Sequence, residues 1–299
     1  MEKNKPSVLV TGASGFLGSH IARTFEENGY RVLSIDLLSM EVDGPNFTAL
    51  LRGEKPQVLV HAAGGASVPF SMENPREDFA SGPNLLSRLL ETLRVNSPKT
   101  RVIFLSSAAV YGDPTQLPVS ESAEIQPISP YGYHKVMSEM VCTTYSKLYG
   151  VPTAIARIFS AYGEGLHKQV LWDLCSRLIV EPAVLSLKGT GMESRDFLHA
   201  QDVSRGILAI ATHGSFEADI YNLASGKETP IREIAELLIA EFGEKSALEF
   251  DGIQPDGNPK NWRADITKLS ALNFSPAVNL EQGVKDYVKW FMELPEVKS

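Results

Sequence analysis

The stretch from Val8 to Gly18 constrains the fold of this chain more than any other. Three apolar residues, Val8 to Val10, precede Thr11, glycines stand at 12, 15 and 18, and an apolar-periodic segment begins at Phe16. A buried parallel strand that turns sharply into a helix leaves the helix's first backbone amides free to bind phosphate. Gly12 suits the tight turn, Gly15 allows close approach of a pyrophosphate, and Gly18 allows close packing of helix on strand. The stretch therefore predicts a phosphate-binding strand–turn–helix unit.

A carboxylate at the end of the next predicted strand points to a dinucleotide. Asp36 follows Gly18 by 18 residues, where it can accept a hydrogen bond from the ribose of adenosine. The glycine spacing G-x-x-G-x-x-G is one residue longer than the common dinucleotide fingerprint, and a glycine-rich turn without a ligand is the alternative. The loop and the carboxylate together favour dinucleotide binding.

Alternating strand and helix patterns predict an α/β fold, a Rossmann-type doubly wound parallel sheet with a smaller, interleaved C-terminal α/β lobe. Residues 1–165, with a return segment at about 200–226, are expected to form the dinucleotide-binding domain, and residues 166–299 the substrate-binding lobe. Thr229 is the expected N-cap of a helix over 230–242, and residues 193–199 are expected to be a loop. Further strands are expected at 31–35, 57–60, 101–105 and 151–159, and further helices at 16–28, 83–95, from about 131, and at 172–180, 200–211 and 280–294.

Charge and composition exclude several classes of function. The net charge of -8 disfavours binding to nucleic acid or an anionic membrane, and no run reaches the roughly 18 apolar residues of a membrane span. Cys142 and Cys175 are the two cysteines, without metal-ligand spacing, so we expect no metal and buried free thiols in a reducing, cytoplasmic compartment. The leucine-rich segment 83–95 is apolar on two adjoining helix faces, which indicates either a partner subunit or simply core.

A tyrosine and a lysine four residues apart carry the predicted chemistry. A phenol has an ordinary pKa of about 10 and becomes a useful base only where cations stabilise its phenolate. Lys135, one helical turn after Tyr131, supplies one cation, and an oxidised nicotinamide would supply another. Ser107 follows the strand 101–105 and is expected to hold a substrate hydroxyl, although serines there are often only caps. The set suits hydride transfer at an alcohol carbon.

The order of these motifs resembles the extended short-chain dehydrogenase/reductase family, in its nucleotide-sugar epimerase/dehydratase branch. The resemblance implies an NAD cofactor, a catalytic triad of Ser107, Tyr131 and Lys135, and a homodimer through the helices at about 83–96 and 131–149. The matching segments are 11–18, 61–63, 106–112, 131–135, 157–163, 189–199, 221–226 and 264–265. The implied cofactor-binding residues are Gly12, Ser14, Gly15, Phe16, Leu17, Gly18, Asp36, His61, Ala62, Ala63, Tyr131 and Lys135, and the implied substrate-binding residues are Ser107, Ser160, Arg195 and Arg263.

Departures from the family pattern bear on the substrate and the reaction. Ser160 stands where the family commonly has asparagine, and a second asparagine is missing near Asp78 or Ser81. Ala108 and Ala109 occupy the places where related dehydratases and decarboxylases carry acidic residues, and methyl groups cannot shuttle protons. Loss of water or carbon dioxide from the sugar is therefore not expected.

The expected function is an NAD-dependent epimerase that moves hydride to and from carbon 4 of a nucleotide-linked hexose, with Tyr131 as acid and base. Asp36 favours NAD, which suits an internally recycled cofactor. One alternative is an NAD(P)H-dependent reductase of nucleotide-linked 4-keto-6-deoxyhexoses, which the short link of about twenty residues between Asp36 and Gln57 favours. A second alternative is a non-catalytic NAD-binding protein.

Overall fold

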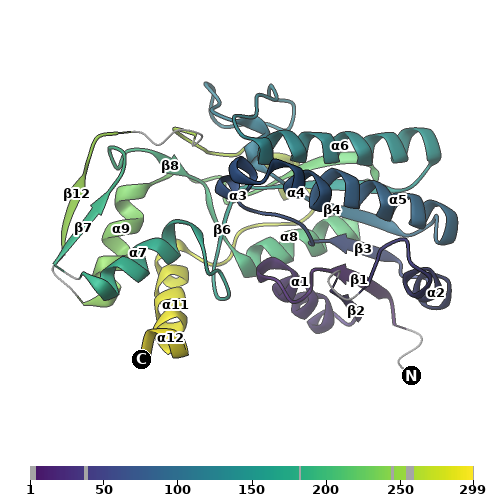
Figure 1. Cartoon of the computed structure of the whole chain (residues 1–299), viewed down its shortest axis with the longest axis horizontal. Coiled ribbons are helices and arrows are strands. Elements are labelled where there is room, and N and C mark those ends of the chain that lie inside the picture. Colours follow the sequence, from purple (N-terminus) through teal and green to yellow (C-terminus); the bar gives the residue numbers. More distant parts are fainter. Residues whose placement is uncertain (1–4, 37–39, 182, 244–245, 254–258, 299) are drawn as a thin grey trace.

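A parallel sheet of six strands forms the centre of the larger part of the molecule (Figure 1). The structure is a computed structural model that describes residues 5–36, 40–181, 183–243, 246–253 and 259–298. The strand order is β10-β5-β4-β3-β1-β2, so the chain reverses direction across the sheet between β1 and β3, which opens a crevice at their carboxyl ends. The strands are β1 (Ser7–Thr11), β2 (Arg31–Ile35), β3 (Val58–His61), β4 (Arg101–Ser107), β5 (Thr153–Ile158) and β10 (Glu217–Leu223).

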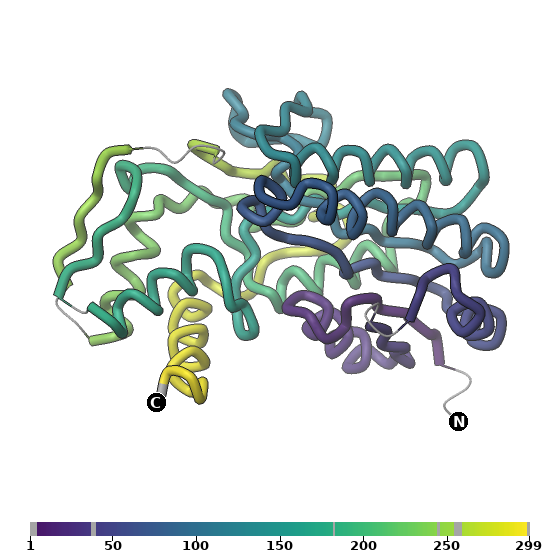
Figure 2. The backbone as a smooth tube through the Cα atoms, in the orientation of Figure 1, coloured from purple at the N-terminus to yellow at the C-terminus, as the bar shows by residue number. Residues whose placement is uncertain are grey.

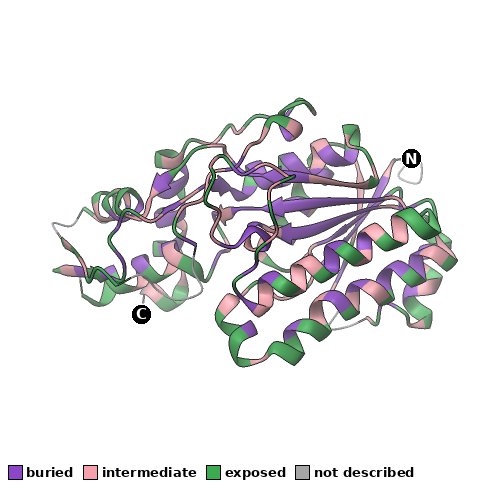
Figure 3. Ribbon diagram, turned by 90° about the horizontal axis from the view of Figure 1, so that it is seen from above, coloured by how far each residue is buried: buried purple, intermediate pink, exposed green. Residues whose placement is uncertain are grey.

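Helices cover both faces of this sheet, because successive strand residues point to opposite sides. Val8 and Val10 pack with α1 (Phe16–Glu27) and α8 (Ala200–His213) on one face. Leu9 packs on the other face with α2 (Pro45–Glu54), α5 (Leu85–Asn96) and α6 (Pro130–Tyr149). Figure 3 shows buried strands between helices whose outer faces are exposed. The predicted doubly wound α/β fold is confirmed.

A smaller part of the molecule has its own hydrophobic core and contains the C-terminus (Figure 2). Its helices are α7 (Gln169–Val180), α9 (Ile231–Phe242), α11 (Leu280–Glu293) and α12 (Pro295–Lys298), with β7 (Val184–Leu187) paired to β12 (Ala247–Phe250). Between α7 and α9 the chain returns to the large sheet through α8 and β10. The exact division at residue 165 stays a prediction.

The predicted loop over 193–199 is wrong, because this segment contains two short strands. Here β8 (Ser194–Arg195) pairs with β11 (Thr229–Pro230), and β9 (Phe197–His199) pairs with β6 (Ser160–Tyr162). The same pairing overturns the predicted cap at Thr229. Since Thr229 lies opposite Arg195 in the ladder, Pro230 takes the N-cap position and α9 begins at Ile231.

The predicted helix at 83–95 is interrupted near its start. Pro83 lies in a π-helical turn, η2 (Ala80–Asn84), because proline cannot donate the helical hydrogen bond, and α5 begins at Leu85. Two short helices precede this turn, α3 (Val68–Glu73) and α4 (Pro75–Phe79). The remaining elements are the short helix η3 (Ala108–Tyr111) after β4 and α10 (Thr267–Ser270).

Candidate active site

The glycine-rich turn after β1 forms a cradle that only glycine backbone can build. Gly12 has φ +72°, and a Cβ there would lie 2.8 Å from the Cα atom of Ala63. A Cβ on Gly18 would lie 1.9 Å from the carbonyl oxygen of Gly12, so helix and turn touch through bare backbone. Gly15 is the N-cap of α1, and no side chain caps that helix. The amides of its first turn thus suit a bound pyrophosphate.

Asp36 lies immediately after β2, beside this cradle. The hydroxyl of Ser14 donates a hydrogen bond to Oδ2 of Asp36 at 3.1 Å. The turn and the carboxylate predicted to bind the cofactor are therefore neighbours in space.

His61 ends β3 at the crevice but points into the protein. Its side chain is 1% exposed, and Nδ1 lies 2.8 Å from the hydroxyl of Thr11 at the end of β1. Burial, reinforced by the charge of Lys135, lowers the pKa of His61 to about 3. A neutral imidazole therefore joins the ends of β1 and β3 and stacks on Phe104 in the middle of β4, while Ala62 and Ala63 follow it in the chain.

Ser107, Tyr131 and Lys135 come together at the carboxyl end of β4. Tyr131 is hydrogen-bonded to Ser107, but burial still raises the pKa of its phenol to about 12. The Nζ atom of Lys135 lies 5.6 Å from the centre of the Tyr131 ring and donates to the carbonyl of Leu105 at 2.9 Å. Burial lowers the pKa of Lys135 to about 8. Ser107 also accepts a hydrogen bond from the amide of Ala109. The same side chain therefore caps η3 and is hydrogen-bonded to Tyr131.

Two serines hold the start of α6, and with it Tyr131. The hydroxyl of Ser129 accepts from the amide of Gly132 at 3.2 Å, and the hydroxyl of Ser71 accepts from the amide of Tyr131 at 3.1 Å. Further along α6, Glu139 forms a buried ion pair with Arg157 on β5. Sequence reasoning missed Ser71 and Glu139, because their partners are distant in the chain and no local pattern marks them.

A small cavity of about 10 Å³, room for about one water molecule, lies beside Tyr131 and Lys135. Its walls come from the loop after β3, from α4 and η2, and from α6. The lining residues are His61, Ala63, Gly64, Gly65, Asp78, Ser81, Gly82, Phe104, Tyr131, His134, Lys135 and Ser138.

Arg195 and Arg263 lie on neighbouring segments near the smaller lobe. Arg195 packs over the ring of Trp262 at 5.5 Å, and burial lowers its pKa to about 10, which leaves it cationic at neutral pH. The Nε atom of Arg263 is buried and has no hydrogen-bond partner in the described part of the chain, so an anionic oxygen would satisfy it. Asp196 accepts hydrogen bonds from the amides of Ala264, Ser225 and Gly226, and thereby ties the two arginine-bearing segments together.

Ser160 reaches the same region through β6. Its amide donates to the carbonyl of Asp196 at 3.0 Å, and its strand pairs with β9. Asp196 thus links the segments that carry Ser160, Arg195 and Arg263, the residues predicted to bind substrate.

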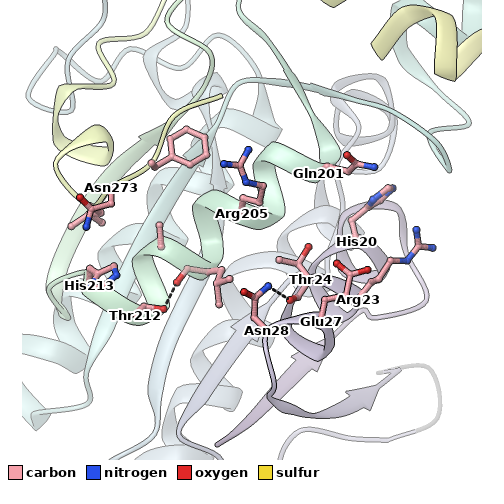
Figure 4. A pocket seen from close by; sticks show the side chains of 14 residues that line it. His20, Arg23, Thr24, Glu27, Asn28, Gln201, Arg205, Thr212, His213 and Asn273 are labelled. Atoms are coloured by element: carbon pink, nitrogen blue, oxygen red, sulfur yellow. Dashed lines mark hydrogen bonds between the residues drawn. The ribbon is translucent and has the colours of Figure 1, made fainter. Parts of the chain in front are cut away.

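A groove of about 530 Å³ runs between α1 and α8 on the outside of the molecule (Figure 4). Its lining is polar and of mixed charge, with Arg23, Glu27 and Arg205 labelled in the view. Arg205 pairs with Asp202 at 2.6 Å. None of the predicted site residues lines this groove, so it is separate from the candidate active site.

None of the helices in the described ranges is long and apolar enough to cross a membrane. Among the same residues, no group of three or more His, Cys, Asp or Glu side chains is arranged to hold a metal ion.

Known proteins match this chain along nearly its whole length. A UDP-glucuronate 4-epimerase from Thermodesulfobacterium geofontis is 28% identical, with 95% of this chain and 96% of the relative covered. The structure of a UDP-N-acetylglucosamine 4-epimerase from Methanobrevibacter ruminantium superposes with a TM-score of 0.87 at 26% identity, covering 96% of this chain and 98% of that one. A UDP-glucuronic acid 4-epimerase from Bacillus cereus, solved with UDP-glucuronic acid and NAD, gives 0.86 at 26% identity and covers 96% of this chain and 99% of that one.

The family pattern described as the NAD dependent epimerase/dehydratase family matches residues 8–224. This match spans the glycine cradle, Asp36, and the Ser107, Tyr131 and Lys135 group, and it makes NAD the cofactor. The chain belongs to the NAD-dependent epimerase/dehydratase family.

Proposed function

We propose that this protein is an NAD-dependent epimerase that inverts carbon 4 of a UDP-linked hexose. The observation that carries the proposal is the meeting of Tyr131, Ser107 and Lys135 at the crevice beside the glycine cradle. The 4-epimerases similar to this chain act on UDP-sugars, which supports UDP as the nucleotide.

Tyr131 is the acid and base of the proposed reaction. As phenolate it takes the proton from the hydroxyl on carbon 4, and as phenol it returns that proton to the oxygen on the inverted carbon. Ser107, already hydrogen-bonded to Tyr131, holds the same substrate oxygen, and the charge of Lys135 stabilises the phenolate. Bound NAD supplies the hydride acceptor, and later the hydride donor, for carbon 4.

The cofactor and substrate contacts follow from the same geometry. We assign the pyrophosphate to the first turn of α1, with Gly12, Ser14, Gly15, Phe16, Leu17 and Gly18, and the adenosine ribose to Asp36. We assign the nicotinamide side of the crevice to residues 61–63, at the end of β3 and just after it. The substrate diphosphate lies against Arg195 and Arg263, and Ser160 contacts the sugar, so residues 166–299 outside the return segment supply most of the substrate lobe.

We further propose a cytoplasmic homodimer. Cys142 and Cys175 are free and buried, which suits a reducing compartment. Exposed apolar side chains lie along α6 and the end of α5, which supports an interface there. These side chains are Val95, Tyr133, Met137, Met140, Leu148 and Tyr149.

The experiment uses purified protein and no added cofactor. UDP-glucose, UDP-galactose, UDP-glucuronate and UDP-N-acetylglucosamine, each deuterated at carbon 4, are incubated separately and followed by NMR. An epimerase inverts carbon 4 of at least one of them and keeps the deuterium, because the same hydride returns to the same carbon.

The competing function is 4-ketoreduction, which the short link between β2 and β3 favours. A reductase would leave these UDP-sugars unchanged and would oxidise added NADH or NADPH one for one with a nucleotide-linked 4-keto sugar. A non-catalytic NAD-binding protein would do neither, and the presence of Ser107, Tyr131 and Lys135 together argues against it.

A further inference from the structure

An acidic residue and a histidine form a close pair beside the candidate catalytic residues. Oδ2 of Asp78, on α4, lies 2.6 Å from Nδ1 of His134, on α6. The Asp78 side chain is 3% exposed and that of His134 is 14% exposed. The pair therefore spans from the protein interior to solvent.

The same pair lines the water-sized cavity that Tyr131 and Lys135 line. His134 follows Tyr131 by one turn of α6 and directly precedes Lys135. The carboxylate also packs on the loop after β3, since a Cβ on Gly65 would lie 2.8 Å from Oδ1 of Asp78. Tyr131, His134 and Lys135 thus border one water-sized space.

The chemistry of the pair suits proton exchange. A carboxylate that accepts from Nδ1–H fixes the tautomer of a histidine, leaves Nε2 as a base, and stabilises the imidazolium once Nε2 is protonated. Among the described residues, the His134 ring bonds to Asp78 through Nδ1, and the rings of His134 and Phe79 pack edge-to-face. Histidine is the side chain whose ordinary titration lies nearest neutral pH.

We propose that Asp78 and His134 form an acid–base pair that moves protons between Tyr131 and solvent. The phenol O–H bond of Tyr131 breaks as its proton passes to the cavity water, and that water gives a proton to Nε2 of His134. The imidazolium then releases its proton to solvent, and the reverse sequence protonates Tyr131. No electrons move, and no bond of the substrate changes.

This inference rests on the proposed role of Tyr131. In an epimerase the substrate proton returns to the substrate, so the pair is needed only to bring resting enzyme to its phenolate form. Tyr131 and Lys135 on α6 and His61 on β3 line the same cavity, and Glu139 lies further along α6. The negative charge of Asp78 raises the pKa of both Tyr131 and Lys135, so protonation of His134 offsets a charge that opposes phenolate formation.

The test measures how fast Tyr131 ionises in NAD-loaded protein after a jump in pH. Phenolate absorbance is recorded by stopped flow, and the Tyr131→Phe protein gives the signal of the other tyrosines. We expect His134→Gln to slow this ionisation at least about tenfold, and added imidazole to restore the rate. A pair that only clamps α4 to α6 would leave imidazole without effect.

Asp78→Asn is the second variant, for the case that His134→Gln does not fold. Asparagine keeps the shape of aspartate and one acceptor oxygen. This variant should slow the ionisation of Tyr131. His213→Gln changes an exposed histidine at the end of α8 and should leave the rate unchanged.

Two outcomes separate the inference from the proposed function. If Tyr131→Phe abolishes turnover, while Tyr131 in the His134→Gln protein ionises at the normal rate, the pair has no part in proton exchange. If Tyr131→Phe retains normal turnover, the proposed role of Tyr131 is wrong and the inference falls with it.

Discussion

The pKa of the Tyr131 phenol depends on the groups that surround this one residue. Its burial raises the pKa of the phenol to about 12, which opposes the phenolate that the proposed reaction needs. The hydrogen bond from Ser107 and the nearby charge of Lys135 act in the opposite direction. Bound cofactor would add a further positive charge.

Tyr131→Phe should lower turnover by about 10²- to 10⁴-fold, because it removes the acid–base hydroxyl and keeps the ring. NAD content, measured on cofactor released from the purified protein, should not change. Tyr133→Phe is the matched control, since this exposed tyrosine lies two residues away and should retain full turnover. Near-normal turnover of Tyr131→Phe would contradict the assignment.

Asp36 should make this protein prefer NAD to NADP. A carboxylate accepts from a ribose 2′-hydroxyl but repels a 2′-phosphate in a partly desolvated site. Calorimetric titration of cofactor-free protein should give tighter binding of NAD by at least about tenfold, and Asp36→Asn should narrow that ratio. Glu27→Gln, on the exposed side of α1, should leave the ratio unchanged. Tighter binding of NADP to the unaltered protein would refute the placement of Asp36.

At the scale of elements, polar contacts between strand and helix ends hold the site together. His61 joins β3 to Thr11 on β1, and Ser71 on α3 joins the start of α6. Because both groups are buried, the loss of either hydrogen bond would leave an unsatisfied polar atom, at a cost of about 1–3 kcal/mol.

Burial of His61 predicts that acid destabilises the fold. Its pKa is about 3 in the folded protein and 6.5 when exposed, so the folded state binds fewer protons between these values. The stability that neutral His61 supports is complete above pH 6.5 and falls by about 1.4 kcal/mol for each pH unit towards 3. Urea unfolding of His61→Gln at several pH values should show a shallower loss than the unaltered protein, whereas His213→Gln should keep the original slope.

At the scale of the whole molecule, the two parts are joined by the chain's return through α8 and β10 and by the short ladders of β8 and β9. At this junction Arg195 and Arg263 lie on neighbouring segments, since the amide of Trp262 donates to the carbonyl of Ser194. The outer face of α6 remains apolar, with Met137 41% and Met140 63% exposed.

The double substitution Met137→Glu and Met140→Glu should convert the proposed dimer to a monomer. Charges placed in an apolar interface lose hydration without gaining partners, so association weakens. Light scattering coupled to size exclusion should give the mass of two chains for the unaltered protein and of one chain for the double variant. Val180→Glu, at an exposed apolar position on α7, should remain dimeric. A single-chain mass for the unaltered protein would overturn the interface.

The sequence alone predicted those features that depend on neighbouring residues. The turn from Val8 to Gly18 follows from strand periodicity and from a φ at Gly12 that favours glycine, and the spacing of Tyr131 and Lys135 follows from the pitch of one helix. The alternation of continuously apolar strands with helical segments likewise predicted the α/β class.

Only the tertiary structure decided contacts between segments far apart in the chain. Thr229 would cap a helix on local grounds, but in the folded chain it pairs with Arg195 in an antiparallel ladder instead. Asp78 and His134 lie 56 residues apart, and Ser71 and Tyr131 lie 60 apart. No local propensity encodes such pairs, because their energy arises only when the sheet and its helices have packed and have excluded water from between them.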